Sequence, residues 1–281
     1  MLKKFFCFTA LIVLAFFTPS VRACANQDTR TEIKLPVVMY HSVLKSKSGK
    51  YIVSPSAFEE DLKAFLKSGY TFVFPSEVID FCLGDGSLPE KPVLITFDDG
   101  HYNNMYYALP LIEKYNAKAL ISFIGKFTEH STSSGDHSNP NYSHLTWAQL
   151  KQLQDGGYFE IGNHTYNMHN YKPRFGVAQK TGESREEYLR NLGEDLAALE
   201  GKLSENGIGK PQTFAYPFGK YNDTVQGFLS DNGYKMMFTC NEGVSVVRRG
   251  SPESLYKIRR INRDGNMSSD ELIKKIESFY R

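Results

Sequence analysis

Cysteine is scarce in this chain, and its spacing limits what the cysteines could do. Only four of the 281 residues are cysteines, and two of them, Cys7 and Cys24, lie within the first 25 residues. Cys82 and Cys240 remain, far apart and without C-x-x-C spacing, so neither is expected to be catalytic. They are either buried free thiols or, in an exported protein, a disulfide.

Net charge is also low. The chain has 33 basic and 31 acidic residues. Removing residues 1–25 would take away Lys3, Lys4 and Arg22 but no acidic residue, which leaves 30 basic and 31 acidic residues. A balance so close to zero, without any motif typical of RNA or DNA binding, excludes nucleic acid as the expected partner.

The N-terminal apolar run, FFCFTALIVLAFF, is too short for a comfortable membrane span. It follows Lys3 and Lys4 and precedes the small-residue site Ala23-Cys24-Ala25. This pattern is typical of a secretory signal peptide, so we expect an extracytoplasmic protein of bacterial type. The segment VRAC also resembles a weak lipoprotein box, and lipid attached to Cys24 would be the expected membrane anchor.

The rest of the chain alternates between predicted strands and helices, without internal repeats or low-complexity tracts. Strands are expected at 36–40, 92–97 and 158–162, among others, with helices over most of the intervals. Alternating β and α units predict a parallel sheet covered by helices. The expected fold class is therefore α/β, a distorted (β/α) barrel of about seven parallel strands. An open doubly wound sheet is the alternative.

Capping signals refine some of these elements. Ser56 and Glu59 could form a capping box in the helix predicted within 54–70, and Thr146 and Gln149 could cap another. A polar loop is expected at 131–143 and a strand at 255–261.

Polar residues capable of chemistry follow three of the expected strands. The first strand runs into Asp98 and Asp99 within TFDDG, the second into the histidines of EIGNHTYNMHN, and the third into TFAYPFG. Each motif alone is common, since paired acids often cap turns and histidines often form structural hydrogen bonds. Together, one aspartate with His164 and His169 supplies nitrogen and oxygen ligands for an open divalent-metal site. The second aspartate could then act as a general base on the bound water.

The three motifs together resemble those of the polysaccharide deacetylases of carbohydrate esterase family 4, which share the NodB homology domain. TFDDG, HTYNMH and FAYPFG carry the likeness, and LPVVMYHSV and LTWAQLKQLQDGGYFEIGNHT extend it over nearly all of the mature chain. The resemblance implies a NodB-like catalytic domain at 33–281, after the signal peptide (1–25) and a linker (26–32).

The first two motifs carry implied roles, residue by residue. Asp98 matches the catalytic base, and Asp99, His164 and His169 match the ligands of one divalent metal ion. Zn²⁺ is the expected metal, with Co²⁺, Ni²⁺ or Fe²⁺ as alternatives. The implied reaction is hydrolysis of an acetyl group by water that the metal activates.

The third motif partly departs from the family pattern. It implies a backbone N–H near Phe218 that binds the tetrahedral oxyanion, with Tyr216 in the same oxyanion or substrate site. The family's arginine in this motif, which steadies the catalytic aspartate, is replaced by Ala215. The sequence therefore names no partner that orients Asp98.

Two further departures point to one branch of the family. The two histidines are five residues apart rather than four, and KIRRINRDG lacks the histidine of the late Leu-x-His motif. Both are similar to the branch that deacetylates poly-β-1,6-N-acetylglucosamine. In that branch the acid is implied to be a histidine placed like His41, which directly follows the first strand. His144 is a weaker candidate, and His41 could instead be a structural loop residue.

The favoured function is thus metal-dependent removal of N-acetyl groups from an extracellular glycan, poly-N-acetylglucosamine first and peptidoglycan or chitin-like polymers next. Alternatives are an O-acetyl esterase acting on xylan-like polysaccharide and a catalytically impaired carbohydrate-binding pseudoenzyme. A structural surface lipoprotein would rest on Cys24 alone. Trp147, Tyr102 and Tyr166 could stack on sugar rings or simply pack. The protein is expected to be a monomer.

Overall fold

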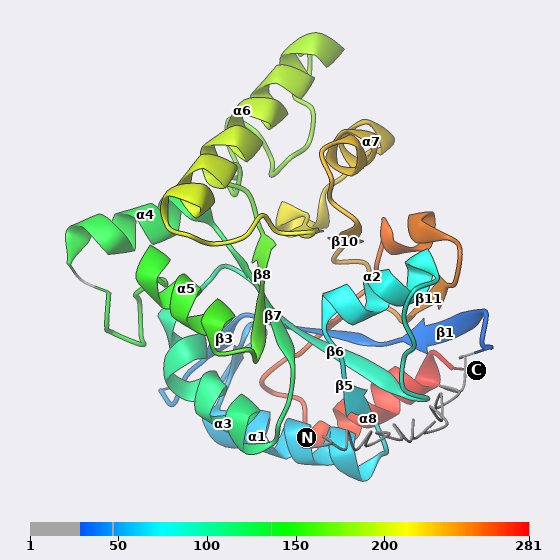
Figure 1. The fold of residues 1–281 in the computed structure, drawn as a ribbon. Helices are drawn as coiled ribbons and strands as arrows, with labels where there is room; N and C mark the ends of the chain where they lie inside the picture. The colour runs from blue at the N-terminus through cyan, green and yellow to red at the C-terminus, as the bar shows by residue number, and fades with distance from the viewer. Residues whose placement is uncertain (1–28, 47, 136, 281) are drawn as a thin grey trace, which may run out of the picture.

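A curled parallel sheet forms the centre of the protein (Figure 1). The computed structural model describes residues 29–46, 48–135 and 137–280. The main sheet has the order β10-β9-β8-β7-β6-β2-β12, with β5 beside β6, and all its pairings are parallel. Its strands are β2 (Val37–Tyr40), β5 (Thr71–Phe72), β6 (Pro92–Phe97), β7 (Ala119–Phe123), β8 (Phe159–Asn163), β9 (Thr213–Ala215), β10 (Met236–Phe238) and β12 (Ile261–Asn262). The predicted α/β barrel-like fold is confirmed.

One C-terminal segment joins the two edges of this sheet. The Ile258 N–H donates to the Met237 carbonyl of β10, and the Ile258 carbonyl accepts from Thr239, both at 2.9 Å. A few residues later, β12 pairs with β2 at the other edge. The continuous strand predicted at 255–261 is wrong, because the chain must cross from one edge to the other there. A short 3-10 helix, η3 (Pro252–Leu255), precedes the crossing.

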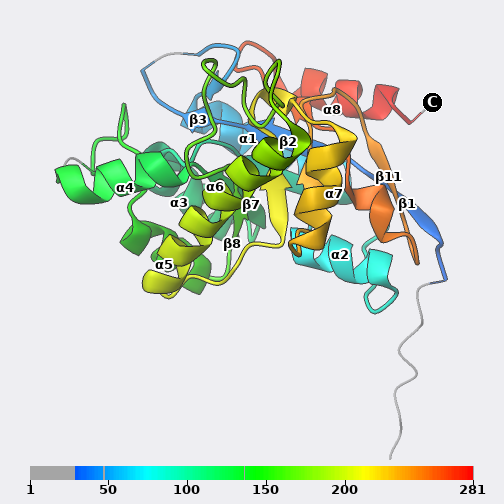
Figure 2. The same cartoon turned by 90° about the horizontal axis from the view of Figure 1, so that it is seen from above.

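Helices cover both faces of the sheet, with α1 beside α8 and α6 beside α7 (Figures 1 and 2). They are α1 (Pro55–Lys67), α2 (Pro75–Leu83), α3 (Leu109–Lys114), α4 (Gly125–Ser134), α5 (Trp147–Asp155), α6 (Arg185–Glu205), α7 (Asp223–Asp231) and α8 (Ser269–Ser278), with a π-helical turn η1 (Asn104–Ala108) and a 3-10 turn η2 (Pro217–Gly219). Outside the main sheet, β1 (Glu32–Leu35) pairs antiparallel with β11 (Ser245–Arg248), and β3 (Ser42–Val43) pairs with β4 (Ile52–Val53).

Burial on both faces explains why β6 is so uniformly apolar. Val93, Ile95 and Phe97 pack into one hydrophobic cluster, whereas Leu94 packs into another. A parallel strand covered on both sides needs such a continuous apolar run. The strand therefore holds the residues that follow Phe97 firmly at one end of the sheet.

One of the two predicted capping boxes is confirmed, and the other is wrong. The capping box of Thr146 and Gln149 is present. The one assigned to Ser56 and Glu59 is wrong, because Pro55 begins α1 and the Ser54 hydroxyl accepts the Ala57 N–H. The loop expected from residue 131 begins later, since α4 continues to Ser134.

The predicted signal peptide and Cys24 lie outside the described residues. Among the residues that the structure describes, none of the helices has the length and apolar character needed to span a membrane. Cys82 and Cys240 are both free thiols rather than a disulfide.

Candidate active site

The expected chemical groups converge at the C-terminal ends of the parallel strands. Asp98 and Asp99 follow β6, His164 follows β8, and His41 follows β2. Together with His169 they border one cavity of about 840 Å³. In barrel-like α/β enzymes this end of the strands carries the active site.

Asp99, His164 and His169 form a compact group that could hold a metal ion. The Asp99 Oδ1 atom lies 3.6 Å from Nε2 of each histidine, and the three ligand atoms lie within 4.8 Å of one another. Asp99 Oδ1 is buried without a hydrogen-bond partner, as expected of an atom placed for a cation. His164 Nδ1 lies 2.8 Å from the Ala215 carbonyl, which leaves Nε2 free to bind.

The electrostatics favour the ligand forms of these side chains. Burial, together with the neighbouring His164, lowers the pKa of His169 to about 4, so its imidazole is neutral near pH 7. Burial alone would raise the pKa of Asp99, but His101, His41 and His164 outweigh burial and hold this pKa below its usual range. Neutral histidines and an ionised carboxylate are the forms that bind divalent metals.

The loop between the two histidines is held by side chains from outside it. The carboxylate of Asp195 on α6 accepts the backbone N–H groups of Tyr166 and Asn167 at 2.8 and 2.7 Å. Thr165 has a positive φ of 74°, and its N–H donates to Asn163 Oδ1 at 2.6 Å. These contacts order a loop one residue longer than usual and keep His169 facing the cavity.

Arg260 provides the partner of Asp98 that the sequence did not reveal. Its Nη1 and Nη2 atoms each lie 2.8 Å from one Asp98 oxygen, and its Nε donates to the Thr239 carbonyl at 2.9 Å. The Arg260 side chain is fully buried. Burial alone would raise the pKa of Asp98, but the Arg260 charge and hydrogen bonds outweigh it and keep the carboxyl ionised.

Arg260 thus contacts the aspartate that the family resemblance would pair with an arginine at position 215. Ala215 lies at the end of β9, where its carbonyl contacts His164. Arg260 comes from the segment that joins the sheet edges. The sequence does carry one indication of Arg260. A buried carboxylate needs a cation, and the segment KIRRINR near the C-terminus contains three arginines.

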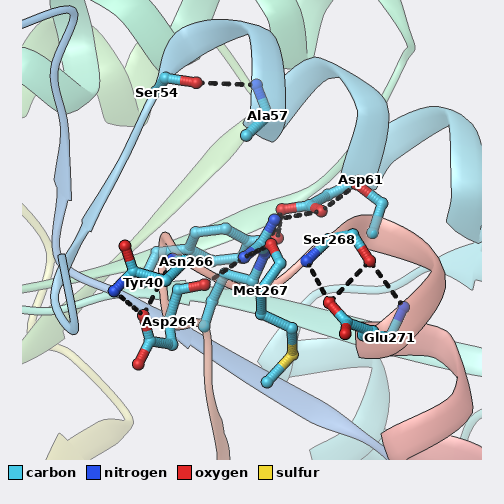
Figure 3. Close-up of polar contacts among 11 residues, drawn as sticks. Tyr40, Ser54, Ala57, Asp61, Asp264, Asn266, Met267, Ser268 and Glu271 are labelled. Atoms are coloured by element: carbon cyan, nitrogen blue, oxygen red, sulfur yellow. Dashed lines mark hydrogen bonds and ion pairs between the residues drawn. The ribbon is translucent and has the colours of Figure 1, made fainter. Parts of the chain in front are cut away.

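The same segment supplies a second buried arginine. Arg263 Nε and Nη2 donate to the Asp61 carboxylate at 2.7 and 2.9 Å, and both side chains are fully buried. The hydroxyls of Tyr40 and Ser269 also donate to Asp61, at 3.0 and 2.6 Å. Figure 3 shows Asp61 of α1 directed toward the segment that leads into α8. These bonds anchor the end of β2, directly before His41.

The two histidines proposed from the sequence as the acid lie in different surroundings. His41 borders the cavity, with its ring centroid 4.7 Å from that of Tyr51. Burial lowers the pKa of His41, although Asp98 and Asp99 oppose this shift. His144 instead packs outside the cavity lining, 4.8 Å from the His101 ring. Its position at the cavity makes His41 the better candidate for the acid.

The third motif forms a tight turn, and the ring of its tyrosine is buried. Phe218 has a φ of 56°, a left-handed conformation that is rare for a bulky residue. The Tyr216 side chain is fully buried, and its hydroxyl contacts Met237 Sδ at 3.0 Å. Its ring therefore packs in the core, and Tyr216 and Phe218 both border the cavity.

The aromatic residues considered for sugar stacking also pack. Trp147 is buried, and its Nε1 donates to Glu129 at 2.9 Å. Tyr102 and Tyr166 are partly buried against the main hydrophobic cluster. Exposed rings at the cavity come instead from Tyr51, Tyr171 and Phe175.

The fold and the site define an α/β enzyme with an open nitrogen and oxygen ligand set beside a buried carboxylate. The chain belongs to the polysaccharide deacetylase family, whose model matches residues 85–237, more than half of the sequence. The family resemblance of the motifs is thereby confirmed, and the protein is a hydrolase of this type.

Comparisons with individual proteins agree. A Bacillus subtilis protein, YxkH, that carries the name of a polysaccharide deacetylase is 29% identical over 252 residues, which cover 89% of this chain and 79% of that protein. A poly-β-1,6-N-acetyl-D-glucosamine N-deacetylase of Staphylococcus aureus is 28% identical over 292 residues, covering 96% and 94%. The solved structure of IcaB from Ammonifex degensii superposes with a TM-score of 0.70 at 27% identity, covering 86% and 97%.

Proposed function

We propose that this protein is an exported, metal-dependent enzyme that removes N-acetyl groups from poly-β-1,6-N-acetylglucosamine. The observation that carries the proposal is the division of labour between two adjacent carboxylates. Asp99 faces two histidines, whereas Asp98 is held by Arg260 in the same cavity. The name of the Staphylococcus aureus relative, which this chain matches over nearly its whole length, supports the choice of substrate.

Each residue has one task in the proposed reaction. A divalent cation held by Asp99, His164 and His169 would supply the Lewis acidity that activates water and polarises the acetamide carbonyl. Asp98, kept ionised by Arg260, takes the proton of the attacking water. The water oxygen forms a new C–O bond to the carbonyl carbon and gives a tetrahedral intermediate, and the C–N bond then breaks to yield acetate and a free amine.

Two further groups complete the reaction. The backbone N–H of Phe218 donates to the oxygen that becomes negative in the tetrahedral intermediate. His41 gives a proton to the departing amine nitrogen. Because the pKa of His41 is lowered, its imidazole is neutral at rest. The proton that Asp98 takes from the water must therefore pass to His41 before the C–N bond breaks.

The function itself is tested by metal depletion and a panel of acetylated glycans. Treatment with a chelator is expected to abolish acetate release, and addition of Zn²⁺, Co²⁺ or Ni²⁺ should restore it at one ion per chain. The panel contains poly-β-1,6-N-acetylglucosamine, chitin oligomers, peptidoglycan and acetylated xylan, with acetate measured enzymatically. Release from the first polymer should be fastest. Full activity in protein stripped of metal would contradict the proposal, and preference for xylan would make the enzyme an O-acetyl esterase.

Replacing His41 with alanine is expected to lower kcat by about 10²–10⁴-fold, because the amine would depart without a proton donor. Metal content, measured by atomic emission, should stay at the wild-type value. His144→Ala is the matched control, a histidine that lies outside the cavity lining and should leave kcat nearly unchanged. Equal rates for His41→Ala and wild type would remove His41 as the acid.

The contact between Arg260 and Asp98 weakens the case for a pseudoenzyme. The pseudoenzyme alternative draws on the arginine missing from position 215, but Arg260 contacts the same carboxylate.

Export is also part of the proposal, with or without a lipid attached to Cys24. Mass spectrometry of the N-terminus of the mature protein tests both, since uncleaved protein retained in the cytoplasm would contradict them.

A further inference from the structure

Three aromatic rings form a stepped surface beside the candidate active site. Tyr171, Phe175 and Phe218, here called the aromatic platform, have ring centroids 4.4 Å (Tyr171 to Phe218), 5.0 Å (Phe175 to Phe218) and 5.6 Å (Tyr171 to Phe175) apart. The angles between their planes are 28°, 23° and 21°, respectively. Their faces are thus nearly parallel and offset.

The platform is both open to solvent and continuous with the cavity. Tyr171 is 72% exposed and Phe175 is 36% exposed, so two neighbouring rings of the platform form a patch open to solvent. All three residues border the cavity that contains Asp98 and Asp99. The Phe218 ring also lies 4.4 Å from that of His169. A ligand on the platform would therefore adjoin the proposed reacting group.

Close packing of a loop against a turn holds the aromatic platform in place, and one residue of that turn keeps an unfavourable backbone conformation. The Gly176 N–H donates to the Asn170 carbonyl at 2.9 Å and closes the loop that carries Tyr171 and Phe175. A Cβ on Gly176 would lie 2.8 Å from the Pro217 carbonyl oxygen, so only glycine lets this loop rest against the turn. Phe218 keeps its left-handed φ of 56° within that turn. Strain of this kind persists where surrounding structure enforces it, often at ligand sites.

We propose that the aromatic platform binds the pyranose ring of a β-linked N-acetylhexosamine next to the unit that loses its acetyl group. A β-linked pyranose presents axial C–H bonds on one face, and the negative face of an aromatic ring attracts them. The stepped rings offer such faces while the cavity receives the neighbouring unit. This inference rests on the proposed function and makes the enzyme one that recognises at least two linked sugar units.

The kinetic test compares a chain substrate with one that lacks a sugar. Tyr171→Ala and Phe175→Ala should each raise KM for a β-1,6-linked N-acetylglucosamine pentasaccharide roughly 3- to 10-fold, with kcat nearly unchanged. Hydrolysis of ethyl acetate, which has neither a sugar nor an aromatic ring to place on the platform, should stay at the wild-type rate. Tyr171→Phe keeps the ring and should keep the KM. Phe279→Ala, which removes a ring of 38% exposure outside the cavity lining, should change nothing.

A binding test separates this proposal from the proposed function. Calorimetry with the same pentasaccharide and the metal-loaded Asp98→Asn protein needs no turnover. Weaker binding when Tyr171→Ala and Phe175→Ala are added supports the platform, even if wild-type protein releases no acetate and the proposed function fails. Unchanged binding and unchanged KM in the doubly substituted protein would overturn it, as would an equal loss of ethyl acetate hydrolysis.

Discussion

Replacing Asp98 with asparagine is expected to lower acetate release by about 10²–10⁴-fold, because asparagine cannot take a proton from water. Metal affinity should be almost unchanged, since the candidate ligand atoms belong to Asp99, His164 and His169. Acetate release and competition with a chelator measure the two quantities separately. Asp99→Ala is the contrasting variant, which should lose both. Activity that survives Asp98→Asn would refute the assignment of the base.

Folding stability must be followed in the same variants, because Asp98 and Arg260 form a buried ion pair. Asp98→Asn or Arg260→Met alone leaves one buried group without its charged partner, which destabilises proteins by about 3–5 kcal/mol. The variant with both substitutions should recover much of this loss and remain inactive. Recovery of stability without activity would separate the structural role of the pair from its chemical role.

Replacing Asp61 with alanine is expected to lower the free energy of unfolding by about 3–5 kcal/mol, as much as breaking the Asp98–Arg260 pair. Arg263 would keep its charge in a fully buried site after losing two hydrogen bonds to the carboxylate. For a domain of this size, such a loss corresponds to a fall in Tm of roughly 6–20 °C, measured by thermal unfolding.

A matched control for Asp61→Ala lies on the same helix. Glu60 pairs with Lys63 at 2.8 Å on the exposed face of α1. Exposed pairs contribute little, so Glu60→Ala should leave Tm nearly unchanged. A second comparison removes both buried charges with Asp61→Leu and Arg263→Met, which should recover part of the lost stability. Equal Tm values for Asp61→Ala and Glu60→Ala would contradict a stabilising role for the buried network.

Much of the candidate site could be predicted because its residues follow strands directly. The apolar run of β6 ends at Phe97, and β8 ends at Asn163, so the parallel arrangement alone brings Asp98, Asp99 and His164 to the same end of the sheet. His41 follows β2 in the same way. For such residues, the alternation of predicted strands and helices, together with a position directly after a strand, is enough to predict where they lie.

Arg260 could not be found by this reasoning, because its role depends on where a distant segment crosses the sheet. The run around it was expected to be one strand, whereas only Ile261–Asn262 pairs with β2. The aromatic platform was missed for a related reason. Tyr171 and Phe175 lie in a loop without periodic signals, and contact between this loop and the turn at Phe218 determines where their rings face.

The joining of the two sheet edges by the C-terminal segment has a consequence for biosynthesis. Asp98 precedes its arginine by 162 residues, and Asp61 precedes its own by 202. A ribosome must therefore add 162 residues after Asp98, and 202 after Asp61, before either acid can meet its arginine, and contacts so distant in sequence form slowly. Until then the growing polypeptide carries two unpaired acids in segments that otherwise form the core. Asp98 gains its partner only after residue 260 has been made.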